Sequence, residues 1–172
     1  LAEKVGKDMS ELTISVGHDS RLSADALKAG VLAGIQKQGC QAVDCSLAST
    51  PSMFMSTVLP QLSYDGAIMI TASHLPFQRN GMKFFSKEGG LESKEIKILL
   101  NKAIALETDG IAEHAEKEIQ KLDLLSHYSA NLRKIICEEV GATEEEMPLK
   151  GMHFVVDASN GAGGFFASQV LE

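Results

Sequence analysis

The sequence lacks several features that would place a chain of this size in a special class. No apolar run approaches the roughly 20 residues needed to cross a bilayer, and residues 1–7 lack the apolar core of a signal peptide. Repeats and low-complexity tracts are absent as well. The chain also lacks an initiator Met, so we expect its natural start to be missing. From these absences we expect no membrane partner and a cytoplasmic location.

Cysteine and positive charge are both scarce. The three cysteines, Cys40, Cys45 and Cys137, form no C-x-x-C pair. An offset of five along one strand places Cys40 and Cys45 on opposite faces, so we expect reduced thiols of an intracellular protein rather than disulfides or zinc ligands. The net charge of −7 argues against a nucleic-acid partner, because binding to phosphate backbones depends on clustered Lys and Arg.

The chain has enough apolar material for a folded core. Its 172 residues are 44% apolar, and the mean hydropathy is +0.01. These values are typical of a soluble globular protein that buries one substantial core and the beginning of a second.

Strand-like and helix-like segments alternate along the sequence. This alternation predicts an α/β layered domain, with a mixed β-sheet between helices. Ser23 and Thr50 are the expected N-caps of the two helices that follow them, and Gly39 is the expected stop of the first. The expected strands are residues 12–16, 41–45, 67–71 and 82–85. The expected helices are residues 23–38, 51–59, 93–106 and 117–140, with a polar loop at 107–116.

A charged, proline-containing segment at residues 144–150 is the expected linker between two domains. Beyond it, residues 152–157 predict a fresh strand, and residues 160–164 predict a turn into a helix. One strand and part of one helix cannot bury a core. We therefore expect residues 1–147 to form a first domain, and residues 148–172 to be the first strand and helix of a second, similar domain of a longer protein.

Ser73 is the most informative residue of the chain. It follows an apolar run, in a loop that Pro76 and the Asn80-Gly81 pair keep out of regular structure. Three interpretations fit the residues themselves: an ordinary loop serine, an acyl-transfer nucleophile with His74 as base, or a serine that carries a phosphoryl group. The second lacks support from any G-x-S-x-G motif.

A phosphoserine needs positive charge nearby, because it adds about −1.5 to −2 charges. Lys83 stands out among the available cations, since a lone lysine opens an apolar strand before Phe84. The cations near the expected turns are His18, Arg21, His74, Arg79 and Lys83.

Four short motifs occur in a fixed order along the chain. They are G-H-D-S-R-L-S at residues 17–23, T-P-S-M at 50–53, T-A-S-H-L-P at 71–76 with N-G-M-K at 80–83, and V-V-D-A-S-N-G-A-G-G at 155–164. Together they resemble the signatures of the α-D-phosphohexomutases, the family of phosphoglucomutase, phosphomannomutase and phosphoglucosamine mutase. The commonest family form has Asn at the position of Leu75.

The resemblance implies intramolecular phosphoryl transfer on hexose phosphates. Sugar 1-phosphates and 6-phosphates would interconvert through a phosphoserine and a bisphosphate intermediate. Ser73 matches the phosphorylated serine, Lys83 the lysine beside the transferring phosphoryl group, and His74 the adjacent loop histidine. Candidate substrate-binding or phosphate-binding residues are Arg21, Arg79 and Asn80.

The resemblance also implies a Mg²⁺ cofactor and partners that are hexose phosphates and hexose bisphosphates. In this chain the metal would be held only through the phosphate on Ser73, because the family's metal loop D-G-D-x-D is absent from these residues. The sugar-reading G-E-x-S-G loop is absent too, so we expect the fragment alone to be inactive. The alternative is a non-catalytic mutase-like domain that binds a sugar phosphate or a protein partner.

Overall fold

The computed structural model describes residues 1–106, 118–159 and 161–171. The polar loop expected at residues 107–116 lies outside the described residues. The strands are β1 Thr13–His18, β2 Gln41–Leu47, β3 Gly66–Ile70, β4 Met82–Ser86, β5 Gly89–Gly90 and β6 Gln120–Lys121. The α-helices are α1 Ala2–Val5, α2 Ala24–Lys37, α3 Thr50–Val58, α4 Ser93–Leu106, α5 Leu124–Val140 and α6 Ala167–Leu171, with short 3-10 turns at Met9–Glu11, Glu144–Glu146 and Ala162–Phe165.

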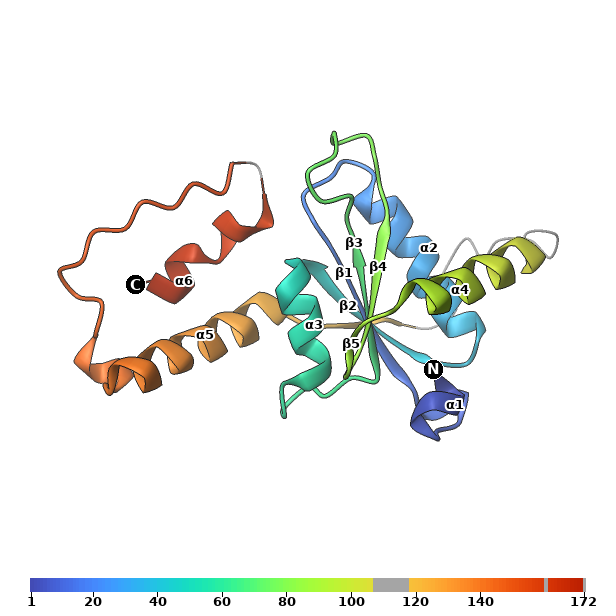
Figure 1. The fold of residues 1–172 in the computed structure, drawn as a ribbon, viewed down its shortest axis with the longest axis horizontal. Coiled ribbons are helices and arrows are strands. Elements are labelled where there is room, and N and C mark those ends of the chain that lie inside the picture. Colours follow the sequence, from blue (N-terminus) through green and yellow to red (C-terminus); the bar gives the residue numbers. More distant parts are fainter. Residues whose placement is uncertain (107–117, 160, 172) are drawn as a thin grey trace.

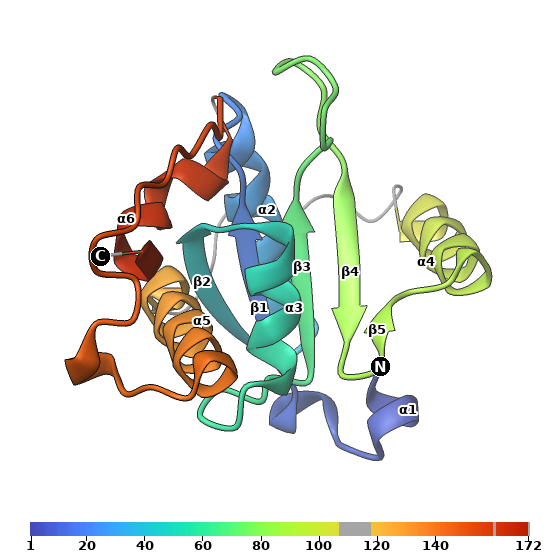
Figure 2. The same cartoon turned by 60° about the vertical axis from the view of Figure 1, so that its left-hand side comes forward.

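The strands form one mixed six-stranded sheet in the order β5-β4-β3-β1-β2-β6. Strand β1 pairs in parallel with β2 and β3, and β2 pairs in parallel with β6. Strand β4 runs antiparallel to both β3 and β5. Helix α2 covers one face of the sheet, whereas α3 and α5 lie on the other (Figure 1, Figure 2). The predicted α/β class and mixed sheet between helices are therefore confirmed.

Each face of the sheet carries its own apolar cluster, because successive side chains of a strand point to opposite faces. On the α2 side, Leu32 and Ile35 of the helix pack with Val16 and Ile70 of the sheet. On the other side, Met53 of α3 and Leu124 of α5 pack with residues of β2 and β3. Burying a side chain of this size contributes about 1.5–3 kcal/mol, so the two clusters hold the layers together.

The three cysteines are free and buried. Cys40 belongs to the cluster on the α2 side and Cys45 to the cluster under α3, which confirms that they lie on opposite faces. Burial raises the pKa of the Cys45 thiol to about 12, and the neighbouring Asp44 carboxylate adds to the effect. Burial also raises the pKa of Cys40. Both thiols are therefore held in the neutral, unreactive form.

The N-cap of α3 is Ser49, so the predicted cap at Thr50 was wrong by one residue. Ser49 and Ser52 cap reciprocally, since each hydroxyl accepts a hydrogen bond from the backbone N–H of the other. Ser23 does occupy the N-cap position of α2, but its side chain makes no capping bond. Its hydroxyl instead accepts a hydrogen bond from Asn80.

The long helix predicted from residue 117 begins only at Leu124. Asp123 caps it by accepting the Ser126 N–H, and the residues before the cap form strand β6, which pairs with β2. Ile119 packs on the α2 side of the sheet and Leu122 on the opposite side. Apolar residues three positions apart share one face of a helix but lie on opposite faces of a strand, so the spacing of Ile119 and Leu122 fits either structure. This segment is a strand because it pairs with the free edge of β2.

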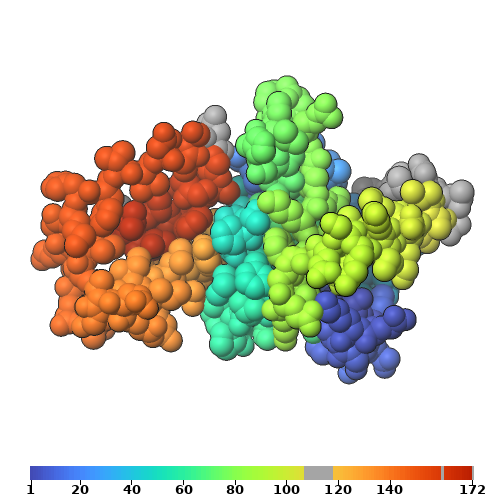
Figure 3. All heavy atoms as spheres, viewed as in Figure 1, coloured from blue at the N-terminus to red at the C-terminus, as the bar shows by residue number. Residues whose placement is uncertain are grey.

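Helix α4 matches its predicted bounds, but its apolar side chains remain largely exposed. None of its residues is buried, and Ile98, Leu100 and Ile104 are each more than half exposed. Figure 3 shows α4 lying along the outside of the molecule. None of the described helices has both the length and the hydropathy to span a membrane.

The strand predicted at residues 152–157 does not form. This stretch pairs with none of the described strands, and Val155 is 98% exposed. A strand exists only through hydrogen bonds to a neighbour, so an apolar run without a partner stays irregular. The turn and helix predicted after it are present as Ala162–Phe165 and α6, which packs beside α5. The division into domains at residue 147 stays a prediction.

Candidate active site

The loops after β1 and β3 meet at the carboxyl ends of these strands. These strands are parallel neighbours, so both carboxyl ends lie on the same side, where ligands bind in open α/β sheets. The loop after β1 holds residues 19–23, and the loop after β3 holds residues 71–81 before the chain returns in β4 (Figure 1). Ser73 lies in the second of these loops.

The backbone of Ser73 has φ of +56°, in the left-handed region that non-glycine residues seldom adopt. This conformation costs about 1–3 kcal/mol unless neighbouring groups hold it. The Ser73 N–H donates to Thr71 Oγ1 at 3.0 Å. Its side chain is exposed, and its hydroxyl has no hydrogen-bond partner within the described ranges. The serine therefore presents a free hydroxyl from a fixed backbone.

Arg21 organises the Ser73 loop. Its Nη2 donates to the Ser73 carbonyl at 2.6 Å. Its Nη1 lies within 3.0 Å of three further carbonyl oxygens, those of Leu75, Pro76 and Arg79. The Arg21 side chain is only 7% exposed. The structure therefore gives Arg21 a loop-shaping role, while direct binding of a phosphate by its guanidinium stays a prediction.

Asp19 anchors the arginine and the loop together. Its Oδ2 accepts from Arg21 Nε at 2.9 Å and from the Thr71 hydroxyl at 2.7 Å. Its Oδ1 accepts from the Arg21 backbone N–H. One carboxylate thus ties the loop after β1 to the loop after β3.

A pocket of about 660 Å³ opens beside Ser73. Its walls come from the loop after β1, the start of α3, the Ser73 loop and the segment after residue 158. The lining residues include Asp19, Arg21, Ser49, Thr50, Pro51, Met69, Thr71, Ser73, His74, Phe77, Ser159, Gly161 and Gly163. The pocket is large enough to hold a small-molecule ligand.

His74 and Lys83 lie on the pocket side of the molecule. His74 lines the pocket and is exposed. Lys83 does not line it, but in the antiparallel pair of β3 and β4 it stands opposite Met69, which does. Residues directly opposite each other share one face of a sheet. The side chain of Lys83 is exposed and has no hydrogen-bond or ion-pair partner in the part of the chain that the structure describes.

Asn80 and Arg79 take different positions at the end of the loop. The Asn80 side chain donates to Ser23 Oγ, and its Oδ1 is buried without a partner among the residues described. Arg79 is exposed, and its carbonyl accepts from Arg21. Neither residue lines the pocket, so binding of substrate or phosphate by Asn80 and Arg79 stays a prediction.

His18, the remaining basic residue near these turns, lies close to α2. Its Nδ1 donates to the Asp19 carbonyl at 2.7 Å, and its Nε2 lies 3.5 Å from Asp25 Oδ1. Asp25 also pairs with Lys28, which in turn pairs with Asp44 at 3.1 Å. His18 thus belongs to a charge network beside the loop after β1 and does not line the pocket.

Three further contributors to the site lie within or beside the sequence motifs, but sequence reasoning gave them no role in it. These are Thr71, the start of α3 at Ser49 and Pro51, and the turn at residues 159 and 161–163. The start of α3 could have been found from its position after β2, a parallel neighbour of β1, because its carboxyl end reaches the same edge. Thr71 opens the motif at residues 71–76, but its role could not be inferred from the sequence, because its hydrogen bonds depend on how the loop folds.

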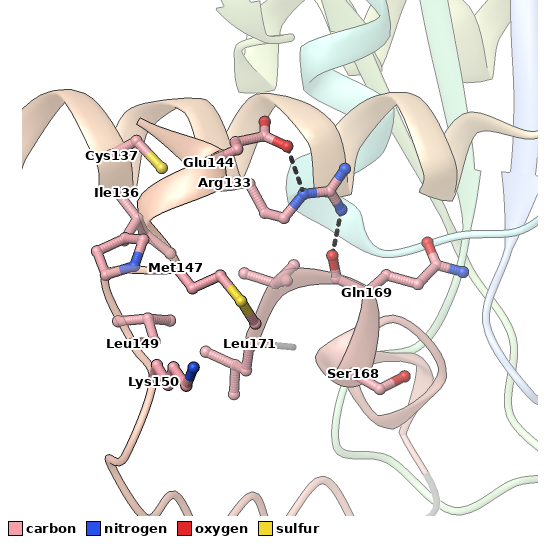
Figure 4. Close-up of a pocket in the computed structure, with 12 residues that line it drawn as sticks. Arg133, Ile136, Cys137, Glu144, Met147, Leu149, Lys150, Ser168, Gln169 and Leu171 are labelled. Carbon is pink, nitrogen blue, oxygen red and sulfur yellow. Dashed lines mark hydrogen bonds and ion pairs between the residues drawn. The ribbon is translucent and has the colours of Figure 1, made fainter. Parts of the chain in front are cut away.

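A second pocket of about 650 Å³ lies between α5, the segment at residues 144–150 and α6 (Figure 4). Arg133 projects from α5 into this seam, where it donates to the Gln169 carbonyl and lies 3.6 Å from Glu144 Oε2. None of the predicted site residues lines it. Within residues 1–106, 118–159 and 161–171, no group of three or more His, Cys, Asp or Glu side chains is placed to hold a metal ion.

Comparison with known proteins matches this chain to one family. A family model described as phosphoglucomutase/phosphomannomutase, alpha/beta/alpha domain I, matches residues 1–122. The chain is 27% identical to a phosphoglucosamine mutase of Pediococcus pentosaceus, over 98% of this chain and 36% of that protein. It is 31% identical to a phosphoglucomutase/phosphomannomutase of Thermococcus kodakarensis, over 92% of this chain and 33% of that protein.

A solved structure supports the fold. The crystal structure of a phosphoglucomutase/phosphomannomutase family protein from Burkholderia thailandensis superposes with a TM-score of 0.55, at 20% identity, over 77% of this chain and 29% of that one. The chain spans about a third of the length of the curated relatives it matches. Since the family model covers more than half of the chain, this protein belongs to the phosphoglucomutase/phosphomannomutase family, and residues 1–122 match the family's α/β/α domain I.

Proposed function

We propose that this chain is the phosphoserine-bearing part of a phosphohexomutase, which interconverts hexose 1-phosphates and 6-phosphates. The observation that carries the proposal is that Ser73, an exposed residue whose hydroxyl has no partner among the described residues, lines a pocket of about 660 Å³. Membership of the mutase family supports the reaction class. The partners would be a hexose phosphate and a hexose bisphosphate.

In the proposed reaction, phospho-Ser73 transfers its phosphoryl group to a hydroxyl of the hexose phosphate. The bond between phosphorus and Ser73 Oγ breaks as a new bond to the sugar oxygen forms, and Ser73 Oγ takes up a proton to become a hydroxyl. The sugar hydroxyl gives up its proton, and His74 lines the pocket where an imidazole could accept it. The bisphosphate then turns over in the site and returns its other phosphate to Ser73.

Catalysis would consist mostly of positioning and charge neutralisation. Lys83 is suited to neutralise the phosphoryl group, because its ammonium is exposed, without a partner among the described residues, and on the sheet face of the pocket. Arg21, whose charge is paired with Asp19, would contribute by positioning, because its Nη2 donates to the Ser73 carbonyl at 2.6 Å. Arg79 is the further exposed cation of the same loop.

A Mg²⁺ ion would act as an electrophilic clamp on the phosphoserine when bound. A phosphoserine oxygen is a hard ligand of the kind that Mg²⁺ prefers. This chain would contribute Ser73 through its phosphate, and the remaining ligands would come from outside residues 1–172.

The remaining parts of the proposal concern the whole protein. Residues 1–147 would form its first domain and residues 148–172 the start of a second, and both parts line the pocket. The three free, buried cysteines support a cytoplasmic location. The fragment alone would be inactive. Incubation of residues 1–172 with glucose 1-phosphate, its bisphosphate activator and Mg²⁺ should give no turnover, and measurable turnover would contradict this point.

The proposal is tested by turnover of hexose phosphates in the full-length protein. Ser73→Ala should abolish conversion of a hexose 1-phosphate to the 6-phosphate, because no phosphoryl carrier remains. Ser63→Ala is a matched control, since Ser63 is another exposed serine with a positive φ, of 51°. Ser63 lies in the turn before β3, at the opposite end of that strand from Ser73. Equal activity in wild type and Ser73→Ala would refute the proposal that Ser73 carries the phosphoryl group.

A further inference from the structure

The backbone of Ser73 is held at both of its polar groups. Its N–H donates to Thr71 Oγ1 at 3.0 Å, and its carbonyl accepts from Arg21 Nη2 at 2.6 Å. Thr71 and Arg21 both donate in turn to the same atom, Asp19 Oδ2, at 2.7 and 2.9 Å. The four residues thus form a closed ring of hydrogen bonds, which we name the Ser73 clasp.

The chemistry of the groups sets the direction of each bond in the clasp. A carboxylate only accepts hydrogen bonds. The single proton of the Thr71 hydroxyl therefore points to Asp19, and its oxygen is left to accept the Ser73 N–H. A hydroxyl is required for this double role. Valine has the same shape as threonine, but it can neither donate a hydrogen bond to Asp19 nor accept one from the Ser73 N–H.

Three of the four clasp residues are also largely shielded from water. Thr71 is buried, and the side chains of Asp19 and Arg21 are 16% and 7% exposed. Hydrogen bonds in such surroundings are stronger than at an exposed surface, and a charge-assisted pair strengthens its neighbours. The ring is therefore able to hold a backbone conformation that serine would not adopt by itself.

We propose that Asp19, Arg21 and Thr71 are positioning residues, which lock Ser73 in its left-handed conformation so that its hydroxyl faces the pocket before substrate binds. Without the clasp, Ser73 relaxes toward negative φ, and the direction of Cβ and Oγ changes with it. The inference rests on the proposed phosphoserine for its catalytic meaning. Its structural part can be measured without any activity.

The first test is hydrogen exchange at the Ser73 amide in the full-length protein, with Thr71→Val, Thr71→Ser and Thr57→Val as variants. Thr57 is a matched control, because it is also a buried threonine and its hydroxyl donates to the Phe54 carbonyl within α3. Thr71→Val should speed exchange of the Ser73 amide at least about fivefold, Thr71→Ser should restore slow exchange, and Thr57→Val should leave it unchanged. Exchange in Thr71→Val at the wild-type rate would overturn the inference.

The second test measures the rate at which the same proteins take up a phosphoryl group from a hexose bisphosphate. Thr71→Val should lower this rate and kcat about tenfold with KM unchanged, because it disturbs the nucleophile and not the sugar contacts. Thr71→Ser should recover most of the loss. Arg21→Lys should also lower the rate of phosphoryl uptake, since an ammonium cannot donate to several carbonyls at once as the planar guanidinium does.

The two tests separate the inference from the proposed function. If wild type takes up no phosphoryl group while Thr71→Val speeds hydrogen exchange of the Ser73 amide, the structural part of the inference holds and the mutase proposal fails. If wild type is phosphorylated and Thr71→Val is phosphorylated equally fast, the clasp has no positioning role and the mutase proposal stands.

Discussion

Asp65 is a buried carboxylate that joins the N-terminal segment to the start of β3. Its Oδ1 accepts from Lys7 Nζ at 2.7 Å, and its Oδ2 accepts the Thr13 N–H at 3.0 Å. Burial alone would raise the pKa of Asp65, but these hydrogen bonds outweigh burial and hold the pKa below its ordinary value of 3.8. The charged form is thus favoured in the folded state. Its contribution to stability is full above pH 3.8 and is lost as the pH falls through the folded pKa.

We predict that Asp65→Asn lowers the free energy of unfolding by about 1–2 kcal/mol at pH 7, because the charge-assisted bond to Lys7 is lost. The difference from wild type should shrink at pH 3, below the ordinary pKa of 3.8, because protonation of Asp65 in the unfolded state reduces the advantage of the charged form in the folded state. Urea unfolding at the two pH values measures this. Glu139→Gln, at an exposed position of α5, serves as the control and should change stability at neither pH. An equal difference for Asp65→Asn at both pH values would contradict the account.

At the residue scale, the sequence indicated Ser73, His74 and Lys83, and the structure places all three on one side of the sheet. Motif spacing brings them together because Ser73 and His74 follow β3 and Lys83 lies in its neighbour β4, while their roles in a reaction stay predictions. The same reasoning did not assign a partner to Thr71 or fix the role of Arg21. Those roles depend on which carbonyl oxygens the Ser73 loop turns toward Arg21 and on the Thr71 hydroxyl reaching Asp19. That geometry arises only when the loops after β1 and β3 meet.

At the element scale, Gly17 shows how closely β1 approaches α3. A Cβ at this position would lie 2.5 Å from Met53 Sδ and 2.8 Å from Ala48 Cβ. The pairing of β1 with β2 also shifts register between Val16 and Gly17. A side chain at Gly17 would therefore push the end of β1 away from the start of α3, where the pocket lies.

We predict that Gly17→Ala lowers the free energy of unfolding by about 1–3 kcal/mol through overpacking. Gly34→Ala is the matched control, for which we expect the free energy of unfolding to rise. Gly34 lies inside α2 with open space around its Cα, so alanine there should stabilise the fold by about 0.5–1 kcal/mol. Urea unfolding of both variants measures the two effects. A Gly17→Ala protein as stable as wild type would show that the contact with Ala48 relaxes freely.

The sequence pattern predicts the central strands well and the edge strands poorly. The central strands β1 and β3 carry apolar runs and are buried, so the sequence placed them within one or two residues. Strand β6 and the run at residues 152–157 could not be assigned in this way, because an edge strand exists only where a neighbour offers its hydrogen bonds. The edge of β2 gives β6 a partner, and none of the described strands pairs with residues 152–157.

At the scale of the whole molecule, the pocket beside Ser73 joins parts that lie far apart in the sequence. Residues from the loops after β1 and β3, from the start of α3 and from the segment after residue 158 line it together. The alternation of strands and helices predicted the layered fold that brings the first three together. It did not predict that Ser159 and Gly161 would close the pocket, because their placement follows from the packing of α6 beside α5.

The central claim is that the hydroxyl of Ser73 carries a phosphoryl group between positions of a sugar. Intact-mass analysis of the full-length protein, after exposure to a hexose bisphosphate and Mg²⁺, tests it most directly. The account predicts one added phosphoryl group, mapped to Ser73, present in Ser63→Ala and absent in Ser73→Ala. An unchanged mass of the wild-type protein, or a phosphoryl group that persists in Ser73→Ala, would contradict it.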